Sequence, residues 1–504
     1  MSNQVQTDRV APSVCFIDLA TFTELEGFLY GGPEAVTLFV RAVQKANWFS
    51  FVPISLRNSG GTPNFGIKKN ASTLNRSGDY VLNTWFRCQI PLISFTPTPA
   101  TPIDTNATLR WTRNLMHNLF ERIWITFNEL MVQEFDNFWL DFNQSFRVRG
   151  SKAVGYRNMI GDIGIMTTGV TVGLAAASPA PLGTGGFFQC PFPFWYCEDT
   201  GVALPVAALP FNDIRVNYDL RDWQDLIVID YPVAIAVAAA APTVGSVVST
   251  NGATPPTVST AISLGRPEVF AHYAVVHNDE RVMMGDAPRD ILIKQVQPQR
   301  ISPISDPNAT LAFDIRGSHA VIAYFFAWRN RSIQDKSQLV TGFTFDVGAE
   351  WSNYTTQAND PFSINVGLDP VSIATLRYEN TPRVSMGSDY YSLTAPWYFS
   401  EAIPEDTGLH YYSYGTDTWA LDPTGSTNYS KLANVSQEYV ASPAALNAVS
   451  TVAAGLAGAN ANQAFVPGGA ATTIAFPQRW EHVFHLYNHN IGRVANGSFG
   501  HPTL

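Results

Sequence analysis

Several short motifs in the chain place polar residues at spacings that could do chemistry, and the loop 421–436 is the first of them. Its sequence, "LDPTGSTNYSKLANVS", combines an Asp-Pro step, a glycine and a Ser-Thr-Asn run. Such residues could hold a phosphate, a metal ion or a sugar. A phosphate-binding loop, however, ends in Lys-Ser/Thr at the start of a helix, whereas Lys431 follows this loop at strand spacing.

The loop therefore predicts a structural turn, in which small polar side chains satisfy backbone groups before the next strand begins. We expect Leu432 and Val435, which follow it, to reach the core. The residues of the predicted turn motif are Asp422, Pro423, Gly425, Ser426, Asn428 and Tyr429.

Three histidines near the C-terminus have the spacing of a metal site on a helix. His482, His485 and His489 are separated by three and four residues. Their surroundings, "EHVFHLYNHN", are rich in aromatic residues and predict a strand instead. On a strand His482 and His485 would face opposite sides, so no metal site is expected.

Two carboxylate pairs, Glu198–Asp199 and Glu405–Asp406, are candidates for acid–base hydrolysis of a glycoside. Each pair belongs to a Glu-Asp-Thr-Gly tetrapeptide, which is also ordinary turn chemistry. A single active site would not need the tetrapeptide twice, so its repetition favours turns. The chain has no Gly-x-Ser-x-Gly, His-Glu-x-x-His or calcium-loop motif. We therefore predict that it is not an enzyme and has no cofactor.

The composition indicates what kind of surface must position these residues. Of the 504 residues only 14% are charged, against about 25% in typical soluble domains, which predicts large contacts with other protein subunits. The net charge of −10 argues against binding to nucleic acid. The polar N-terminus predicts no signal peptide, and no apolar run is long enough for a membrane helix. Four cysteines, Cys15, Cys88, Cys190 and Cys197, are too few for a disulfide scaffold.

Strand patterns dominate the chain and predict an all-β fold. "NDIRVNYDL" (212–220) alternates apolar and polar residues, as a half-buried strand does. "ERIWITFNELMVQEF" (121–135) reads as two strands folded over Asn128-Glu129. Apolar runs at 267–277 and 320–328 predict buried strands. Helical periodicity is brief and is confined to 20–29, 34–44 and 134–142.

Blocks of sequence recur in the same order in the two halves of the chain. "PFWYCEDTG" precedes "NDIRVNY" in the first half, and "PWYFSEAIPEDTG" precedes "NYSKLANV" in the second. The similar strands "EVFAHYAVVHN" and "EHVFHLYNHN" follow, each after a long insertion almost without charge, at about 233–264 and 441–475. This duplication predicts two similar β-sandwiches in tandem, with a boundary near the charged stretch 278–290.

Many ordered blocks also carry a resemblance to a known family. The chain resembles the major capsid protein of iridoviruses and related nucleocytoplasmic large DNA viruses from about residue 16 to the C-terminus, except at the two insertions. The matching segments are "FIDLAT", "LYGGPEAVTLFV", "RSGDYVLNTW", "RWTRNLMHN", "ALPVAALPFNDIRV", "YENTPR", "YYSLTAPWY", "GSTNYSKL" and "NHNIGRVANGSFGHP".

The resemblance implies a double jelly roll, which consists of two tandem eight-stranded jelly-roll β-sandwiches with long loop insertions and a few short helices. It further implies a homotrimer with a pseudo-hexagonal outline, and such capsomers tile an icosahedral shell outside an internal membrane. The implied domains are an N-terminal arm on the inner side of the shell (1–28), jelly roll 1 (29–282) and jelly roll 2 (290–504).

The partners implied are further copies of the chain, minor capsid and penton proteins, and a viral membrane near the inner face, but not nucleic acid. The protein would be a virion component assembled in the host-cell cytoplasm. Two alternatives remain from the residues themselves. A jelly-roll lectin would bind carbohydrate at its surface, and a glycosidase would use Glu198 or Glu405.

Overall fold

The chain divides into two compact units, Met1–Trp48 and Phe49–Leu504. The computed structural model describes residues 20–21, 24–33, 35–41, 43, 45–92, 108–168, 170–171, 185–230, 262–286, 288–299, 301–304, 311–330, 350–356, 368–447, 449–453, 473–477 and 480–500.

Among the described residues of the first unit is the short helix α2 (Glu24–Leu29), inside the segment 20–29 that was predicted to be helical. The helix predicted over 34–44 is wrong, because the described residues of that segment are not helical. Gly31 and Gly32, just before this segment, have φ angles of 98° and 100°. Val36, Leu38 and Phe39 remain exposed, and a short helix that buries no apolar face is only marginally stable.

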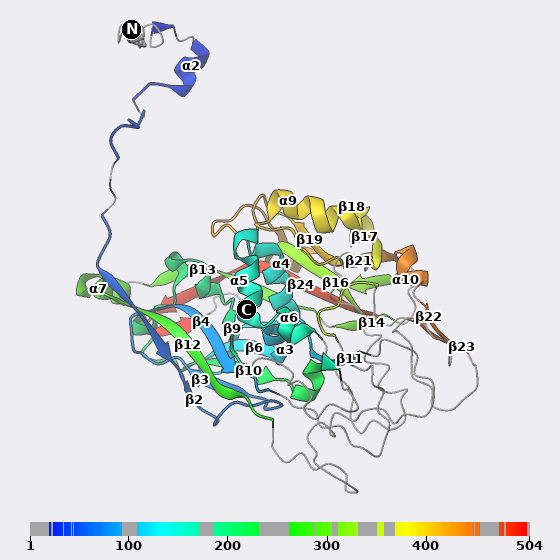
Figure 1. Cartoon of the computed structure of the whole chain (residues 1–504). Helices are drawn as coiled ribbons and strands as arrows, with labels where there is room; N and C mark the ends of the chain where they lie inside the picture. The colour runs from blue at the N-terminus through cyan, green and yellow to red at the C-terminus, as the bar shows by residue number, and fades with distance from the viewer. Residues whose placement is uncertain are drawn as a thin grey trace, which may run out of the picture. The chain divides into compact units, whose positions relative to one another are not determined.

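In the second unit, nine of the strands from β1 to β12 form a sandwich of two facing sheets, roll 1 (Figure 1). Its first sheet has the order β1-β12-β4-β9 and its second sheet the order β2-β3-β10-β6-β7. The bounds of the first sheet's strands are β1 (Phe49–Ser55), β12 (Gly265–Val276), β4 (Tyr80–Gln89) and β9 (Phe187–Phe192). Those of the second are β2 (Arg57–Asn58), β3 (Asn70–Thr73), β10 (Ile214–Leu220), β6 (Phe120–Phe127) and β7 (Leu130–Asp136).

Roll 2 repeats this arrangement strand for strand. Its first sheet has the order β13-β24-β16-β19 and its second sheet the order β15-β21-β17-β18. The bounds are β13 (Arg289–Pro298), β24 (Trp480–Ala495), β16 (Ala320–Asn330), β19 (Leu409–Ser413), β15 (Leu311–Asp314), β21 (Val435–Ala441), β17 (Val371–Tyr378) and β18 (Thr381–Gly387). Apart from short added strands, β2 in roll 1 and three in the first sheet of roll 2, each roll thus has two four-stranded sheets of equivalent order, and the predicted double jelly roll is confirmed.

The predicted strands match the structure because local pattern and turn chemistry agree. β6 and β7 pair from Phe127↔Leu130 onward. Asn128 and Glu129 between them have φ angles of 48° and 70°, as the tight turns that suit twisted hairpins require. In β10 the buried residues Ile214, Val216 and Tyr218 alternate with more exposed ones.

Helices lie mainly in the connections between strands. The helix predicted at 134–142 is α4, which runs Asn137–Arg147 after β7 and begins where the Asp136 side chain accepts a hydrogen bond from the Trp139 N–H. Helix α5 (Gly150–Ile160) follows it, and α7 (Asn278–Asp286) occupies the stretch between the rolls. The other helices in the described residues are α3 (Leu115–Leu119), α6 (Gly164–Thr167), α9 (Ala395–Phe399) and α10 (Pro443–Asn447), with the π-helical turn η6 (Tyr390–Thr394) before α9. None of the described helices is long and apolar enough to cross a membrane.

The remaining short elements of the described chain are β5 (Thr108–Trp111), β8 (Val170–Thr171), β11 (Ile227–Asp230), β14 (Ser302–Ile304), β20 (Thr427–Asn428), β22 (Val449–Ala453), β23 (Thr473–Pro477), β25 (Ser498–Gly500) and the 3₁₀ turns η1 (Trp195–Cys197), η2 (Thr200–Val202), η3 (Val206–Ala208), η4 (Trp223–Leu226) and η7 (Tyr429–Lys431). Among them, β11, β5 and β8 form a separate three-stranded sheet, β22 and β23 form a hairpin, and β14, β20 and β25 extend the first sheet of roll 2. The predicted insertion 233–264 lies outside the described residues except for 262–264. In the described part of 441–475, α10 is followed by a hairpin of β22 and β23.

The two rolls share one apolar core across the surface where they meet, here called the joint. Helix α4 of roll 1 lies on the outer face of the first sheet of roll 2, where the Trp139 and Phe325 rings are 5.3 Å apart and the Phe146 and Tyr411 rings are 5.4 Å apart. The cluster that fills roll 1 therefore continues into roll 2. A second apolar cluster lies between the two sheets of roll 2.

Candidate functional site

A buried network of charges and hydrogen bonds lies where the rolls meet, and it begins with a carboxylate from roll 2. Glu350 belongs to the segment 350–356, here called the strap, which lies in the connection between β16 and β17. Its carboxylate accepts hydrogen bonds from Arg110 Nη1 at 2.5 Å, Thr112 Oγ1 at 2.8 Å and the Arg113 backbone N–H at 3.0 Å. The side chains of Arg110 and Glu350 are each only 1% exposed. The strap is thereby anchored in roll 1.

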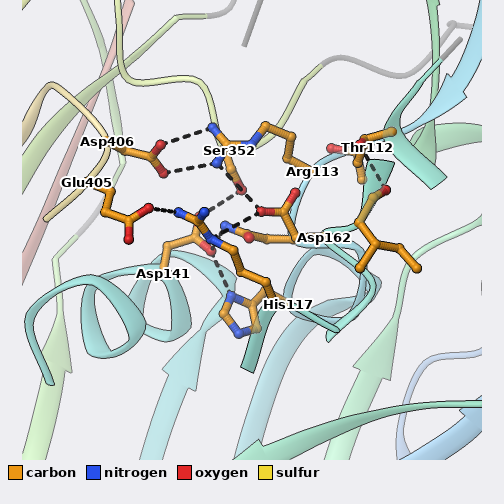
Figure 2. Close-up of polar contacts among 12 residues, drawn as sticks. Thr112, Arg113, His117, Asp141, Asp162, Ser352, Glu405 and Asp406 are labelled. Carbon is orange, nitrogen blue, oxygen red and sulfur yellow. Dashed lines mark hydrogen bonds and ion pairs between the residues drawn. The ribbon is translucent and has the colours of Figure 1, made fainter. Parts of the chain in front are cut away.

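Asp141 on α4 is a second hub of this network, and Figure 2 shows it between roll 1 and the strap. It accepts hydrogen bonds from Asn114 Nδ2 at 3.0 Å, Ser352 Oγ at 2.8 Å and Tyr354 OH at 2.8 Å. His117 Nδ1 lies 2.8 Å from the same carboxylate. A carboxylate offers about four lone-pair sites, so the four partners saturate it.

Arg113 joins the network to the second Glu-Asp pair. Its guanidinium donates to both Asp406 oxygens at 3.1 and 3.3 Å and lies 3.6 Å from Asp162 (Figure 2). Burial lowers the pKa of Arg113, but Asp406, Asp162 and Glu350 outweigh burial and raise it above the usual value. Arg113 therefore stays charged. Arg157 on α5 pairs with Glu405 beside it.

An indole between two arginines completes the joint. The Trp351 ring of the strap has the Arg221 guanidinium of roll 1 at 3.9 Å and the Arg329 guanidinium of roll 2 at 4.1 Å. Burial, together with the charge of Arg329, lowers the pKa of Arg221 to about 10. The Trp351 Nε1–H donates to the Asp225 carbonyl at 2.9 Å. Cation–π contacts of this kind gain strength when they are shielded from water.

The three candidate histidines lie on strand β24. The ring of His482 contacts the roll 2 core, with Nε2 2.7 Å from Tyr439 OH, whereas His485 Nε2 lies 2.8 Å from Asp136 of roll 1. They thus point to opposite faces, as the strand pattern predicts. Burial raises the pKa of Asp136, but His485 and the Trp139 N–H outweigh it and hold the pKa below its usual value. In the described part of the chain, no three His, Cys, Asp or Glu residues are placed to hold a metal ion.

His482 is expected to make the protein acid-sensitive. Burial, with a smaller effect of His485, lowers its pKa from 6.5 to about 3. Between these pH values the unfolded chain binds a proton at His482 that the folded chain does not. The contribution of the neutral His482 to the unfolding free energy is therefore fully present above pH 6.5 and is lost as the pH drops toward 3. The double variant His482→Phe/Tyr439→Phe keeps an aromatic ring stacked on Phe313 without orphaning the phenol. We expect its unfolding free energy between pH 5 and 4 to fall less steeply than the wild type's, by about 1.4 kcal/mol per pH unit.

The matched control for this pH series is His277→Phe at an exposed histidine, whose side chain is 59% exposed. Chemical unfolding at pH 7, 5 and 4 would measure all three proteins. An unchanged slope in the double variant would show that His482 does not contribute to acid sensitivity.

The sequence-predicted carboxylate pairs are all neutralised or used as caps. Glu198 binds Arg147 through both oxygens, at 2.9 and 2.7 Å. Asp199 accepts from the Gly201 N–H at 2.9 Å. Glu405 and Asp406 bind the two arginines already described. Each of the four carboxylates therefore has a partner within the chain.

The turn motif 422–429 packs against the strand β16. Gly425 has a φ of 146°, and a Cβ there would lie 2.8 Å from the Tyr414 carbonyl oxygen. Thr427 and Asn428 form β20, which pairs with Val321 and Ala320. The Asn428 side chain then accepts from the Ser430 N–H at 3.0 Å and caps η7. Tyr429 is buried and its OH lies 2.7 Å from Tyr414 OH, whereas Asp422, Pro423 and Ser426 are exposed.

The chain after the turn differs in detail from the expected strand, because the Asn428 cap starts a 3₁₀ turn and β21 begins only at Val435. Val435 is buried and Leu432 packs against the roll 2 core. Of the cysteines, Cys88, Cys190 and Cys197 are free thiols, and burial raises the pKa of Cys197 to about 12. Cys15 lies outside the described residues.

The hubs Asp141 and Glu350 were not among the residues singled out from sequence. Asp141 lies within the aromatic block "NFWLDFNQSF", and an acid in such a block must find buried partners. That signal could have marked it. Glu350 has no comparable signal, because its partners lie about 240 residues away.

Two tandem jelly rolls in one chain are the fold of double jelly-roll capsid proteins. A family model described as "Major capsid protein N-terminus" matches residues 37–264, and one described as "Large eukaryotic DNA virus major capsid protein" matches residues 280–500. The chain belongs to the major capsid protein family of iridoviruses and other large eukaryotic DNA viruses.

Relatives and solved structures agree with this assignment. The major capsid protein of Wiseana iridescent virus is 42% identical over 493 residues, which cover 96% of this chain and 92% of the relative. That of Lymphocystis disease virus 1 is 36% identical and covers 97% of each chain. The fold is similar to the PBCV-1 virus capsid structure (TM-score 0.64, 15% identity, 93% of this chain and 100% of that chain). It is also similar to the Faustovirus major capsid protein (TM-score 0.61, 11% identity, 95% and 96%). The chain is therefore a structural component of a virion shell.

Proposed function

We propose that three copies of the chain close into a homotrimeric capsomer with a pseudo-hexagonal outline, and that these capsomers tile an icosahedral shell. The observation that carries this proposal is the repetition of one strand order in two rolls of one polypeptide. Three such chains present six similar sandwiches, which suits a near-hexagonal lattice. Cyclic closure of this kind uses the same contact three times.

The other parts of the chain receive roles within this proposal. The arm 1–28 faces the interior near the viral membrane, and the rolls comprise 29–282 and 290–504. The insertions at about 233–264 and 441–475 are long connections before the last strand of each roll, and the second contains α10 and the hairpin of β22 and β23. Neighbouring capsomers, minor capsid proteins and penton proteins are the partners, and assembly takes place in the host-cell cytoplasm.

We also propose that the chain is not an enzyme and that the motif 422–429 is a structural turn. Support for the first comes from the paired state of Glu198, Glu405 and Asp406. Support for the second comes from the Asn428 cap and the backbone pairing of Thr427 with Val321. Low charge and a net charge of −10 suit a protein that meets other subunits rather than nucleic acid.

Light scattering after size exclusion tests the proposal. We expect purified protein at micromolar concentration to have three times the chain mass of 55.3 kDa. Electron microscopy of concentrated samples should show hexagonal arrays or closed shells. A stable monomer that never tiles would contradict the proposal, and selective binding on a glycan array would favour the lectin alternative.

A further inference from the structure

The equivalent first sheets of the two rolls differ in how they are covered. In roll 2, every residue of β19 is buried, and β16 is buried from Val321 to Asn330 on both faces. In roll 1, the equivalent strands β9 and β4 alternate between buried and partly exposed residues. One face of the roll 1 sheet therefore lacks the cover that its counterpart has.

The cover of the roll 2 sheet is α4 of roll 1. The rings of Trp139 and Phe142 on this helix lie 5.3 and 5.7 Å from that of Phe325 on β16. Asp136, at the start of the helix, binds His485 on β24 at 2.8 Å. At this joint, the aspartate that caps the start of a helix binds a histidine on a strand, and the apolar face of the helix packs on the sheet.

The roll 1 sheet carries the matching half of this pattern. Arg87 pairs across the strands with Glu268, as Arg329 pairs with Glu481 in roll 2. His272 lies four residues after Glu268, as His485 lies four residues after Glu481. Antiparallel partners share a face, so the row Ser55, Phe270 and Trp85 lies on the same side as His272. The Trp85 ring stacks 5.6 Å from Phe270 and lies 4.5 Å from His272.

Roll 2 carries the other half, in the connection between β18 and β19 that corresponds to α4. Asp389 lies at the start of the helical segment that begins at Ser388, as Asp136 lies at the start of α4, but the backbone of Asp389 is already helical and its side chain makes no capping hydrogen bond. Leu393 and Trp397 follow at intervals of four residues, on the same side of the helix. They are 55% and 69% exposed, and the neighbouring Tyr398 is 68% exposed. In the described chain, no other element covers this apolar helix face, which has the Asp389 carboxylate at its start.

We propose that the contact between copies repeats the contact within a copy. The segment 389–399 of one chain packs on the first sheet of roll 1 of the next chain, with Leu393 and Trp397 on Trp85 and Phe270 and with Asp389 beside His272. This contact joins two unlike surfaces, and such contacts close into a ring when the rotation allows it. Each of the six rolls in the capsomer then packs its helical segment on the first sheet of the next roll. The inference rests on the proposed trimer and names its surface.

The double variant Leu393→Glu/Trp397→Glu tests this surface. Both side chains are exposed in the single chain, so the circular dichroism spectrum should not change. We expect the mass by light scattering to fall from three chains to one. The matched control is Val282→Glu on α7, which is 70% exposed and should leave the trimer intact.

Exchange of the charged pair gives a second and more specific test. Asp389→Lys alone should weaken the trimer, and Asp389→Lys/His272→Glu should restore it. Mixed assemblies of His272→Cys and Asp389→Cys chains, oxidised with copper phenanthroline, should yield a cross-linked pair on non-reducing gels. A trimeric wild type whose Leu393→Glu/Trp397→Glu variant stays trimeric, without cross-linking of the mixed chains, would overturn the surface and leave the proposed function standing. A monomeric wild type would overturn both.

Discussion

Replacing Glu350 with alanine is expected to destabilise the folded chain by about 3–5 kcal/mol, because the buried Arg110 then loses its ion pair with the Glu350 carboxylate. Glu350 also accepts hydrogen bonds from Thr112 and the Arg113 backbone, so three donors lose their acceptor at once. Since these donors are in roll 1 and Glu350 is in the strap of roll 2, the joint itself should fail first. We expect urea unfolding, followed by tryptophan fluorescence, to split from one transition into two.

Two controls separate the loss of the joint from a general effect of losing an ion pair. The double variant Arg110→Met/Glu350→Leu replaces the buried charges by apolar groups and should recover most of the lost stability. Asp290→Ala removes an exposed pair with Arg493 and should cause little measurable change. If Glu350→Ala were no more harmful than Asp290→Ala, the strap would not hold the rolls together.

The fold of this chain is readable from its sequence where local pattern and repetition agree. Asn128-Glu129 between two alternating runs predicted the β6–β7 hairpin, because only a tight turn with positive φ fits there. The recurring blocks predicted two similar sandwiches, and the strand orders of the rolls confirm them. Each of these inferences used residues close together in sequence, or a comparison of the chain with itself.

The segment 34–44 shows where local pattern misleads. Its apolar residues have helical spacing, but the periodicity alone does not supply a surface to bury them, and Val36 and Leu38 remain exposed. Helix α5 shows the reverse case, since its sequence "GSKAVGYRNMI" has little apolar periodicity. It is fixed instead by contacts such as the hydrogen bond between Tyr156 OH and His117.

The joint between the rolls was beyond prediction for a related reason. Glu350, Ser352 and Tyr354 meet Arg110 and Asp141 across more than 200 residues of sequence. No spacing rule connects groups so far apart, and the identity of a buried acid's partner depends on the tertiary fold. The repetition of the Glu-Asp-Thr-Gly segment did predict turns, and the structure has a 3₁₀ turn at the first segment and a turn at the second. The repetition did not indicate that the second copy reaches the strap.

Because only the second Glu-Asp-Thr-Gly segment reaches the strap, replacing the glycine of each segment with alanine should affect stability to different extents. Gly408 of the second tetrapeptide has a φ of 91°, and a Cβ there would lie 2.0 Å from the Tyr354 carbonyl oxygen. Gly408→Ala must therefore strain its own backbone and displace the strap, whose Tyr354 hydroxyl donates to Asp141. We expect a loss of more than about 3 kcal/mol in unfolding free energy, or failure to accumulate as soluble protein.

The same substitution in the first copy provides the control for Gly408→Ala. Gly201 has no left-handed φ, and a Cβ there would meet only the Asp199 side-chain oxygen, at 3.0 Å. That carboxylate can rotate away, so Gly201→Ala should cost less than about 1 kcal/mol. Thermal unfolding of the two variants beside the wild type measures the difference directly. If the two variants lost equal amounts of unfolding free energy, the close approach of Gly408 to Tyr354 would not hold the strap. If both losses were small, the strap could shift without harm to the joint.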